Sequence, residues 1–200
     1  VNRCVNLNWG VFNLHDALGI LTGLRVRAGN DANCAALGEF WMGGGSGCRS
    51  AIFVTLGTGI GGGVIVDGRL LTGAHGVGGE LGHIEISASD KTPCTCGKRG
   101  CVEQYASANG IVRVTKKRLA ESAEPSCLRA MEHFACKDVF DAARAGDALA
   151  AREVDEMAST LGMALANIAA TTDPEMFMIG GGVARAGEVL FTPLVRHYKE

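Results

Sequence analysis

A compact apolar run, a glycine-rich turn and a second β-type run follow one another over residues 51–71, and this order limits the folds open to the chain. The run AIFVTL (51–56) is β-branched and aromatic, which predicts a buried strand. The stretch LGTGIGGGVIVDGRLL (56–71) then places Gly57, Gly59 and Gly62 in the spacing G-x-G-x-x-G. It continues as a further strand, VIV (64–66), and Asp67-Gly68 predicts a type I′ hairpin in which RLL (69–71) pairs back.

This order argues against a dinucleotide-binding turn, although the glycine spacing fits one. Such a turn must lead from a strand into a helix, because the helix N-terminus holds the pyrophosphate. Here the glycines lead into a strand and a hairpin. A glycine turn between two strands can still present backbone N–H groups to an anion, so we expect a phosphate-binding hairpin of another kind.

The remaining pattern alternates helices and strands, which predicts an α/β protein. We expect a loop or strand over 5–14, a short helix over 16–24, a short strand over 25–31 and a helix over 32–43. A glycine-rich loop (73–84) and a cysteine-rich loop (90–101) follow. The predicted helices beyond them cover 102–122, with an interruption near Asn109-Gly110, then 138–146 and 148–171. Residues 175–195 predict a strand, a triple-glycine turn and a helix.

The charge and the cysteine content of the chain limit the classes of partner and compartment that we expect. The 200 residues carry a formal net charge of −2, which gives no reason to expect a nucleic acid or an anionic membrane surface as partner. No apolar run approaches the ~20 residues that span a bilayer. The eight cysteines are unevenly spaced, unlike a disulfide scaffold, and favour a cytoplasmic protein with reduced thiols and one metal cluster.

Three of these cysteines form the strongest local signal. Cys94, Cys96 and Cys101 give the spacing C-x-C-x4-C, and His83 upstream completes a Cys3His set for a tetrahedral Zn²⁺. Four protein ligands leave no open position for a catalytic water, which favours structural zinc over a zinc hydrolase. The fourth ligand stays open at this point, with three acidic alternatives to His83: Glu80, Glu85 and Glu103.

Asp31, in GNDAN, lies between a predicted strand and a predicted helix. Its carboxylate can cap the helix, or it can act as a general base that takes a proton from a substrate hydroxyl, with Asn30 orienting that substrate. Two glycine turns, at 57–63 and 180–182, suit a nucleoside triphosphate. A carboxylate base and phosphate-binding turns together indicate phosphoryl transfer.

Four motifs, in this order, resemble the ROK family of repressors, open reading frames and kinases, and within it the glucokinases of Gram-positive bacteria. They are NDANCAALGE, LGTGIGGGVIVDGRLLTGAHGVGGELGHI, CTCGKRGCVEQYAS and IGGGVA. The resemblance implies an actin-like ATPase (ribonuclease H-like) fold, in which two α/β lobes close over a cleft. It also implies that ATP with Mg²⁺ phosphorylates a hexose, and that the protein forms a homodimer.

The resemblance assigns roles to individual residues. It implies that Asp31 is the catalytic base and that Asn30, Asp31, Glu80, His83 and Glu103 contact the sugar. It places phosphates at Gly57, Thr58 and Gly59 and the nucleoside at Gly180, Gly181 and Gly182. Zinc ligands by the same resemblance are His83, Cys94, Cys96 and Cys101.

One family motif is missing from these residues. The first phosphate loop, D-x-G-x-T, does not occur, so we expect residues 1–31 to be the C-terminal remnant of a small lobe that is mostly missing, and residues 32–200 to be the large lobe. A terminal helix is also expected to be cut off, and the chain alone to have little activity. Glucose is the expected substrate. N-acetylmannosamine or another hexose, polyphosphate as donor, and a sugar-sensing repressor are the alternatives.

Overall fold

A computed structural model describes residues 10–87, 89 and 92–200, and the chain divides into two compact units, Val1–Asp31 and Ala32–Glu200. In the first unit the predicted helix is α1 (Leu14–Thr22), which starts after its N-cap Asn13 and ends at Gly23 in the left-handed conformation. The predicted strand over 25–31 is wrong, because residues 25–30 are irregular and Asp31 already begins a helix. Of the segment 5–14, residues 5–9 lie outside the described part of the chain.

The second unit contains a sheet built around β1 (Ala51–Leu56). Strand β1 pairs with β2 (Ile60–Val66) in antiparallel register, Ala51 opposite Ile65, and with β4 (Met176–Gly180) in parallel register. The short β3 (Arg69–Leu70) adds to β2, and the order is β3-β2-β1-β4. The positive φ angles of Asp67 (48°) and Gly68 (74°) confirm the predicted type I′ hairpin, although β2 begins at Ile60 rather than at residue 64.

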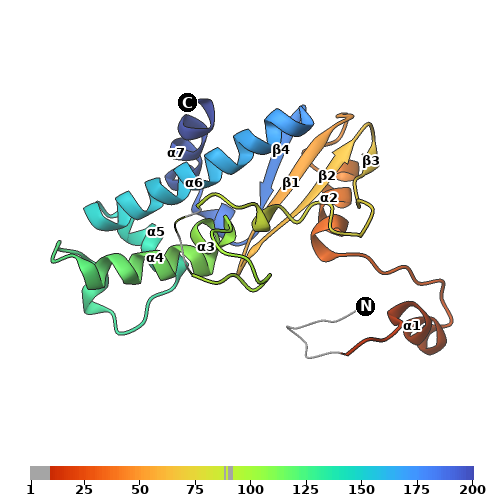
Figure 1. Cartoon of the computed structure of the whole chain (residues 1–200), viewed down its shortest axis with the longest axis horizontal. Helices are drawn as coiled ribbons and strands as arrows, with labels where there is room; N and C mark the ends of the chain where they lie inside the picture. The colour runs from red at the N-terminus through yellow and green to blue at the C-terminus, as the bar shows by residue number, and fades with distance from the viewer. Residues whose placement is uncertain (1–9, 88, 90–91) are drawn as a thin grey trace. The chain divides into compact units, whose positions relative to one another are not determined.

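Seen in Figure 1, α4, α5 and α7 gather at one end of this unit, while the strands lie at the other. The described helices are α2 (Asp31–Met42), α3 (Glu103–Ala106), α4 (Ala108–Glu121), α5 (Cys136–Arg144), α6 (Ala148–Thr172) and α7 (Glu188–Lys199), with 3₁₀ turns η1 (Leu81–His83), η2 (Cys127–Ala130) and η3 (Val183–Ala186). None of them has the length and apolar character that crossing a membrane requires, as far as the described residues go.

The predicted interruption of the 102–122 helix lies at a different place. The chain breaks at Ser107, whose extended backbone (φ −91°, ψ 171°) separates α3 from α4. Its hydroxyl accepts from the amide of Gly110 (2.9 Å) and so caps α4. Asn109 and Gly110 belong to the first turn of α4, where a capping serine rather than a glycine sets the boundary.

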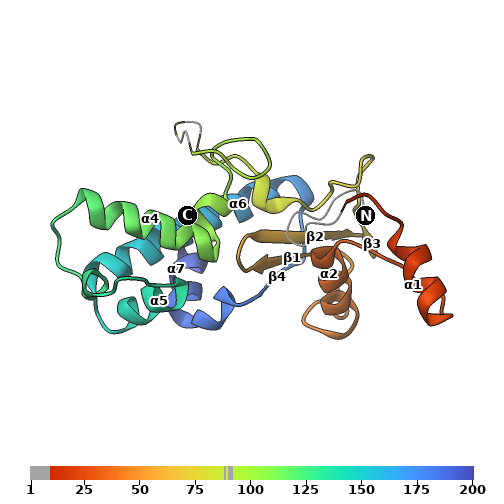
Figure 2. The same cartoon turned by 90° about the horizontal axis from the view of Figure 1, so that it is seen from below.

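The two faces of the sheet carry different partners, as period-2 alternation along β1 requires. Ile52, Val54 and Leu56 belong to the main core, which includes the apolar side of α6. Ala51 and Phe53 face the opposite way and belong to a smaller cluster on the side of α2, which lies below the strands in Figure 2.

On that second side, α2 packs against strand positions that have no side chain. A Cβ on Gly61 would lie 2.9 Å from the Cβ of Ala32, and a Cβ on Gly63 would lie 2.3 Å from the Cβ of Ala36. Both distances are shorter than side chains tolerate. These two glycines of the G-rich stretch therefore serve the close approach of a helix rather than the binding of a ligand.

Replacing glycine by alanine is expected to have opposite effects on the free energy of unfolding at Gly63 and at Gly38. Gly63→Ala should lower the free energy of unfolding by about 1–3 kcal/mol, because the new methyl group overlaps Ala36. Gly38→Ala, on the exposed side of α2 with no atom near its Cβ position, should raise it by up to about 1 kcal/mol. Urea unfolding of both variants checks this, and a Gly63→Ala protein as stable as the parent would contradict the packing argument.

A second expectation concerns pH. The carboxylate of Asp147, the N-cap of α6, is partly buried, which opposes its ionisation, but it accepts from the amides of Ala150 (3.0 Å) and Cys127 (2.7 Å), and its pKa falls from 3.8 to about 2. A depressed pKa in the folded state gives stability that is present above the unfolded-state value and is lost as pH falls towards 2.

Asp147→Ala should therefore cost about 1–2 kcal/mol at pH 7, and the difference from the parent should shrink between pH 4 and pH 2. Asp147→Asn retains an acceptor but has no titrating group, so it should lose less stability at pH 7. Urea unfolding across this pH range tests both variants. A constant gap between the parent and Asp147→Ala would show that the ionised carboxylate is not the stabilising group.

Candidate functional site

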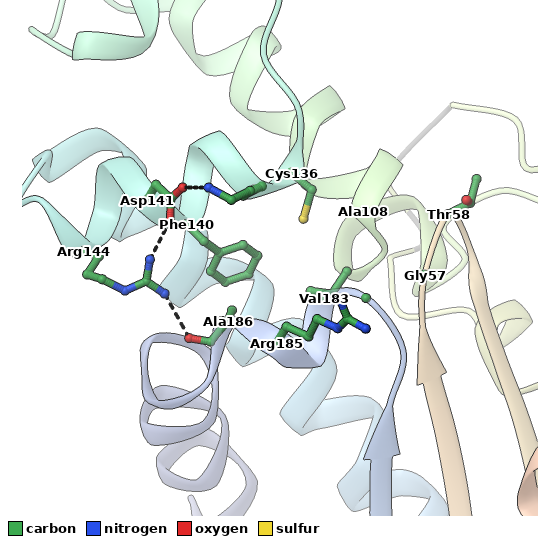
Figure 3. A pocket seen from close by; sticks show the side chains of 12 residues that line it. Gly57, Thr58, Ala108, Cys136, Phe140, Asp141, Arg144, Val183, Arg185 and Ala186 are labelled. Atoms are coloured by element: carbon green, nitrogen blue, oxygen red, sulfur yellow. Dashed lines mark hydrogen bonds and ion pairs between the residues drawn. The ribbon is translucent and has the colours of Figure 1, made fainter.

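A cavity of about 700 Å³ lies where the β1–β2 turn meets α4, α5 and η3 (Figure 3). Gly57 and Thr58 of the turn line one side, and α5 with η3 forms the other. Gly182, at the start of η3, lines it too. Gly59, Gly180 and Gly181 are not among the described lining residues. The cavity thus adjoins both predicted glycine turns, but only some of their residues face it.

The β1–β2 turn is held by backbone hydrogen bonds. The amide of Gly57 donates to the carbonyl of Gly59 (3.0 Å), and the carbonyl of Gly57 accepts from the amide of Ala108 at the start of α4 (2.9 Å). In the described part of the chain, the amides of Thr58 and Gly59 donate to no backbone carbonyl outside the strands. A turn fixed at both sides with spare amides is suited to an anion.

The triple glycine begins with the last residue of β4 and packs against the end of β1. Gly181 has a φ of +92°, and a Cβ there would lie 2.4 Å from the carbonyl oxygen of Leu56. The turn opens the short 3₁₀ helix η3, and α7 begins after Gly187, so the predicted order of strand, glycine turn and helix is confirmed, with η3 placed before the α-helix. The close approach places both glycine turns at the same end of the sheet.

No sequence motif predicted that α5 would form one wall of the cavity. Asp141 forms ion pairs with Lys137 and Arg144, and the Lys137 ammonium is the main cause that lowers the pKa of Asp141. Arg144 also donates to the carbonyl of Ala186 in η3 (3.2 Å), as Figure 3 shows. Arg185 lines the cavity without taking part in any ion pair found among the described residues, and its side chain extends towards the side where Gly57 lies.

Near the other side of the turn, the structure brings His83, Cys94, Cys96 and Cys101 together. Their ligand atoms all lie within 4.8 Å of one another. Cys96 Sγ is 3.6 Å from Cys101 Sγ, and Cys94 Sγ is 3.6 Å from His83 Nδ1. A tetrahedral zinc with bonds of about 2.3 Å separates its sulfur ligands by about 3.8 Å, so the spacing fits.

The chemistry of the donor set agrees with this geometry. Burial raises the pKa of the Cys101 thiol to about 12, whereas the backbone at Lys98 lowers the pKa of Cys96. A buried thiol of this kind needs a cation to hold it as a thiolate. The described cysteines are free thiols, and this cluster is consistent with a zinc-binding motif.

The three acidic residues that were alternatives to His83 as the fourth ligand lie around the cluster. Glu80 Oε2 lies 3.9 Å from His83 Nε2, on the ring nitrogen that faces away from Cys94. Glu85 is exposed and pairs by its backbone with Cys101. Glu103 Oε1 lies 3.3 Å from Cys94 Sγ, but Glu103 is not a member of the group whose ligand atoms all lie within 4.8 Å of one another. His83 is therefore the residue that completes the set of four.

Asn30 and Asp31 occupy the junction at which the first unit ends. Both side chains are exposed, and Asp31 is the first residue of α2. A carboxylate in the first turn suits the partial positive charge of a helix N-terminus.

Comparison with known proteins agrees with the motifs. The profile of the ROK family matches residues 1–200. A glucokinase from Halalkalibacterium halodurans is 44% identical over 202 residues, covering 100% of this chain and 61% of that protein. The crystal structure of a ROK family glucokinase from Streptomyces griseus, in complex with glucose and AMPPNP, is 37% identical with a TM-score of 0.86, and the match covers 100% of this chain and 65% of that one.

A regulator matches as well as the kinases do in structure. The crystal structure of a ROK family transcriptional regulator, a homologue of the E. coli MLC protein, has a TM-score of 0.88 at 31% identity and is covered to 50% of its length. The chain spans less than two thirds of these relatives. The α/β architecture is that of part of the ROK glucokinase structures, and the chain belongs to the ROK family.

Proposed function

We propose that the protein containing this chain transfers the γ-phosphoryl group of ATP to a hexose, with the 6-hydroxyl of glucose as the acceptor. The observation that carries the proposal is the cavity between the β1–β2 turn and η3, which adjoins both glycine turns and has room for a nucleotide. The glucokinase relatives, one of them with glucose and AMPPNP bound, support the choice of substrates.

The nucleotide would lie with its phosphates at the hairpin and its nucleoside against α5 and η3. The spare amides of Thr58 and Gly59 suit phosphate oxygens, and the guanidinium of Arg185 supplies a positive charge that no carboxylate among the described residues neutralises. Phe140 and Val183 give the nucleoside side an apolar surface. Gly180 and Gly181 would shape the turn rather than touch the ligand. Mg²⁺ accompanies the triphosphate as its counter-ion.

The sugar would be held by Asn30, Asp31, Glu80, His83 and Glu103, as the family motifs imply. Asp31 would take the proton from the accepting hydroxyl while the attacking oxygen reaches the γ-phosphorus. Residues 1–31 would be the end of the small lobe and residues 32–200 the large lobe. Closure of the lobes would exclude water, which competes with the sugar as acceptor.

Zinc would be held by His83, Cys94, Cys96 and Cys101 as a structural ion. Bound there, the ion would order the cysteine-rich loop and would take no part in phosphoryl transfer. Glu80, beside the second ring nitrogen of His83, would orient the imidazole.

A second candidate function rests on the match to the transcriptional regulator. A sugar-sensing repressor of this family would bind the same hexose and use the change of shape to release DNA. The carboxylate at Asp31 and the complete glycine hairpin favour the kinase. N-acetylmannosamine and other hexoses remain alternatives to glucose, and polyphosphate an alternative donor.

The first test is ADP release by the complete gene product with ATP and a panel of hexoses, beside Asp31→Asn. Loss of a general base should lower kcat by at least about a hundredfold, because the amide cannot accept the hydroxyl proton. The melting temperature with glucose should still rise in the variant. No turnover with any sugar in the parent, together with a sugar-dependent rise in melting temperature, would overturn the kinase and favour the repressor.

The second test concerns the metal. Cys96→Ser should reduce the zinc content, measured by plasma mass spectrometry, from about one ion per chain to a small fraction of that, since three ligands hold zinc poorly. The melting temperature should fall with it. Cys34→Ser, an exposed thiol on α2, is the matched control and should keep the ion. Full zinc content in Cys96→Ser would remove Cys96 from the ligand set.

A further inference from the structure

One carboxylate lies between the metal cluster and the phosphate hairpin. Glu103 is the first residue of α3 and follows Cys101, a member of the cluster, by two positions. Its side chain is only 14% exposed. A carboxylate this enclosed needs hydrogen-bond donors, and its two oxygens find them in two different parts of the site.

Oxygen Oε2 of Glu103 faces the hairpin. The amide of Ile60, the first residue of β2, donates to Glu103 Oε2 over 3.3 Å. The same oxygen fills the space beside Gly59, where a Cβ would lie 2.5 Å from it. A side chain at residue 59 would therefore have to displace this carboxylate, and the β1–β2 turn is in contact with a residue 43 positions after Ile60 in the chain.

Oxygen Oε1 of Glu103 faces the metal cluster. Glu103 Oε1 lies 3.3 Å from Cys94 Sγ, 3.5 Å from the hydroxyl of Thr95 and 3.8 Å from His83 Nδ1. Two of these three residues belong to the proposed metal set. Displacing the chain around the cluster would therefore displace the carboxylate, and with it the acceptor of the Ile60 amide.

We propose that Glu103 is a positioning residue that couples metal occupancy to the shape of the phosphate hairpin. The proposal rests on the proposed function only in that the hairpin is taken to bind nucleotide phosphate. Metal at the cluster fixes Cys101, two positions before Glu103, and Cys94, in contact with its Oε1, and so holds Oε2 on the Ile60 amide. Loss of the metal frees the loop, and the turn that meets the nucleotide loosens.

Hydrogen–deuterium exchange of the hairpin peptide tests the coupling in the complete gene product, loaded with zinc and after chelation. In the parent, chelation should accelerate exchange around Ile60 about tenfold. In Glu103→Ala, exchange should already be fast with zinc bound, and chelation should add little. Zinc content should stay at the parental value, because Glu103 is not a ligand. Glu85→Ala removes an exposed acid whose backbone pairs with Cys101, and this variant should behave as the parent.

Affinity for a fluorescent ATP analogue gives a second readout. It should fall about tenfold in Glu103→Ala at unchanged zinc content, and by a similar factor in the chelated parent. Should Glu103→Ala fail to fold, Glu103→Gln decides, since it keeps the shape and an acceptor but loses the charge that strengthens the bond. With zinc bound, its hairpin exchange should lie between that of the zinc-loaded parent and that of the chelated parent. Exchange as slow as in the zinc-loaded parent, both with zinc and after chelation, would overturn the coupling.

The outcomes separate this proposal from the kinase proposal. Exchange and zinc content do not depend on turnover or on nucleotide. If chelation leaves the exchange rate of the hairpin unchanged in the parent, the coupling is overturned even if the protein phosphorylates glucose. Hairpin exchange that follows zinc through Glu103, in a protein that binds no nucleotide, would uphold the coupling and overturn the function assigned to the hairpin.

Discussion

The site depends on the pairing of β1 with two different strands. Its antiparallel partner β2 returns through the 57–59 turn, and its parallel partner β4 ends in the triple glycine, so both turns leave the sheet at the end where β1 finishes. The core side chains Ile52, Val54 and Leu56 fix the strand against the helical layer. Because β1 is held on both edges and on both faces, the two turns have fixed positions relative to each other, and α5 only has to close the remaining side of the cavity.

Local signals in the sequence predicted much of this arrangement. Asp67-Gly68 determines its hairpin through two positive φ angles, which few other residue pairs adopt easily. The long α6 follows from apolar residues at steps of three and four, and its end from Asp173-Pro174. The cysteine spacing and His83 could be grouped because zinc accepts few ligand types. In each case the information lies within a few residues or in a strict chemical rule.

What could not be predicted depends on contacts between distant residues. RVRAGND has the alternation of a short strand, but the structure gives it no strand partner among the described residues, and a lone extended segment has no ladder to stabilise it. The α5 wall carries no motif, since Lys137, Asp141 and Arg144 read in sequence as an ordinary charged helix face. The bond from Ile60 to Glu103 was equally invisible, because only the fold brings a turn and a helix start together.

The glycine face under α2 also favours one register of the helix on the strand. Ala32 and Ala36 are one helical turn apart, a rise of about 6 Å, and they meet Gly61 and Gly63, two strand residues or about 6.8 Å apart. Because the two repeats nearly match, both alanine methyl groups fit against the strand at once. A shift of α2 along β2 by about half of this repeat would place both methyl groups between the glycines and so lose the two contacts together.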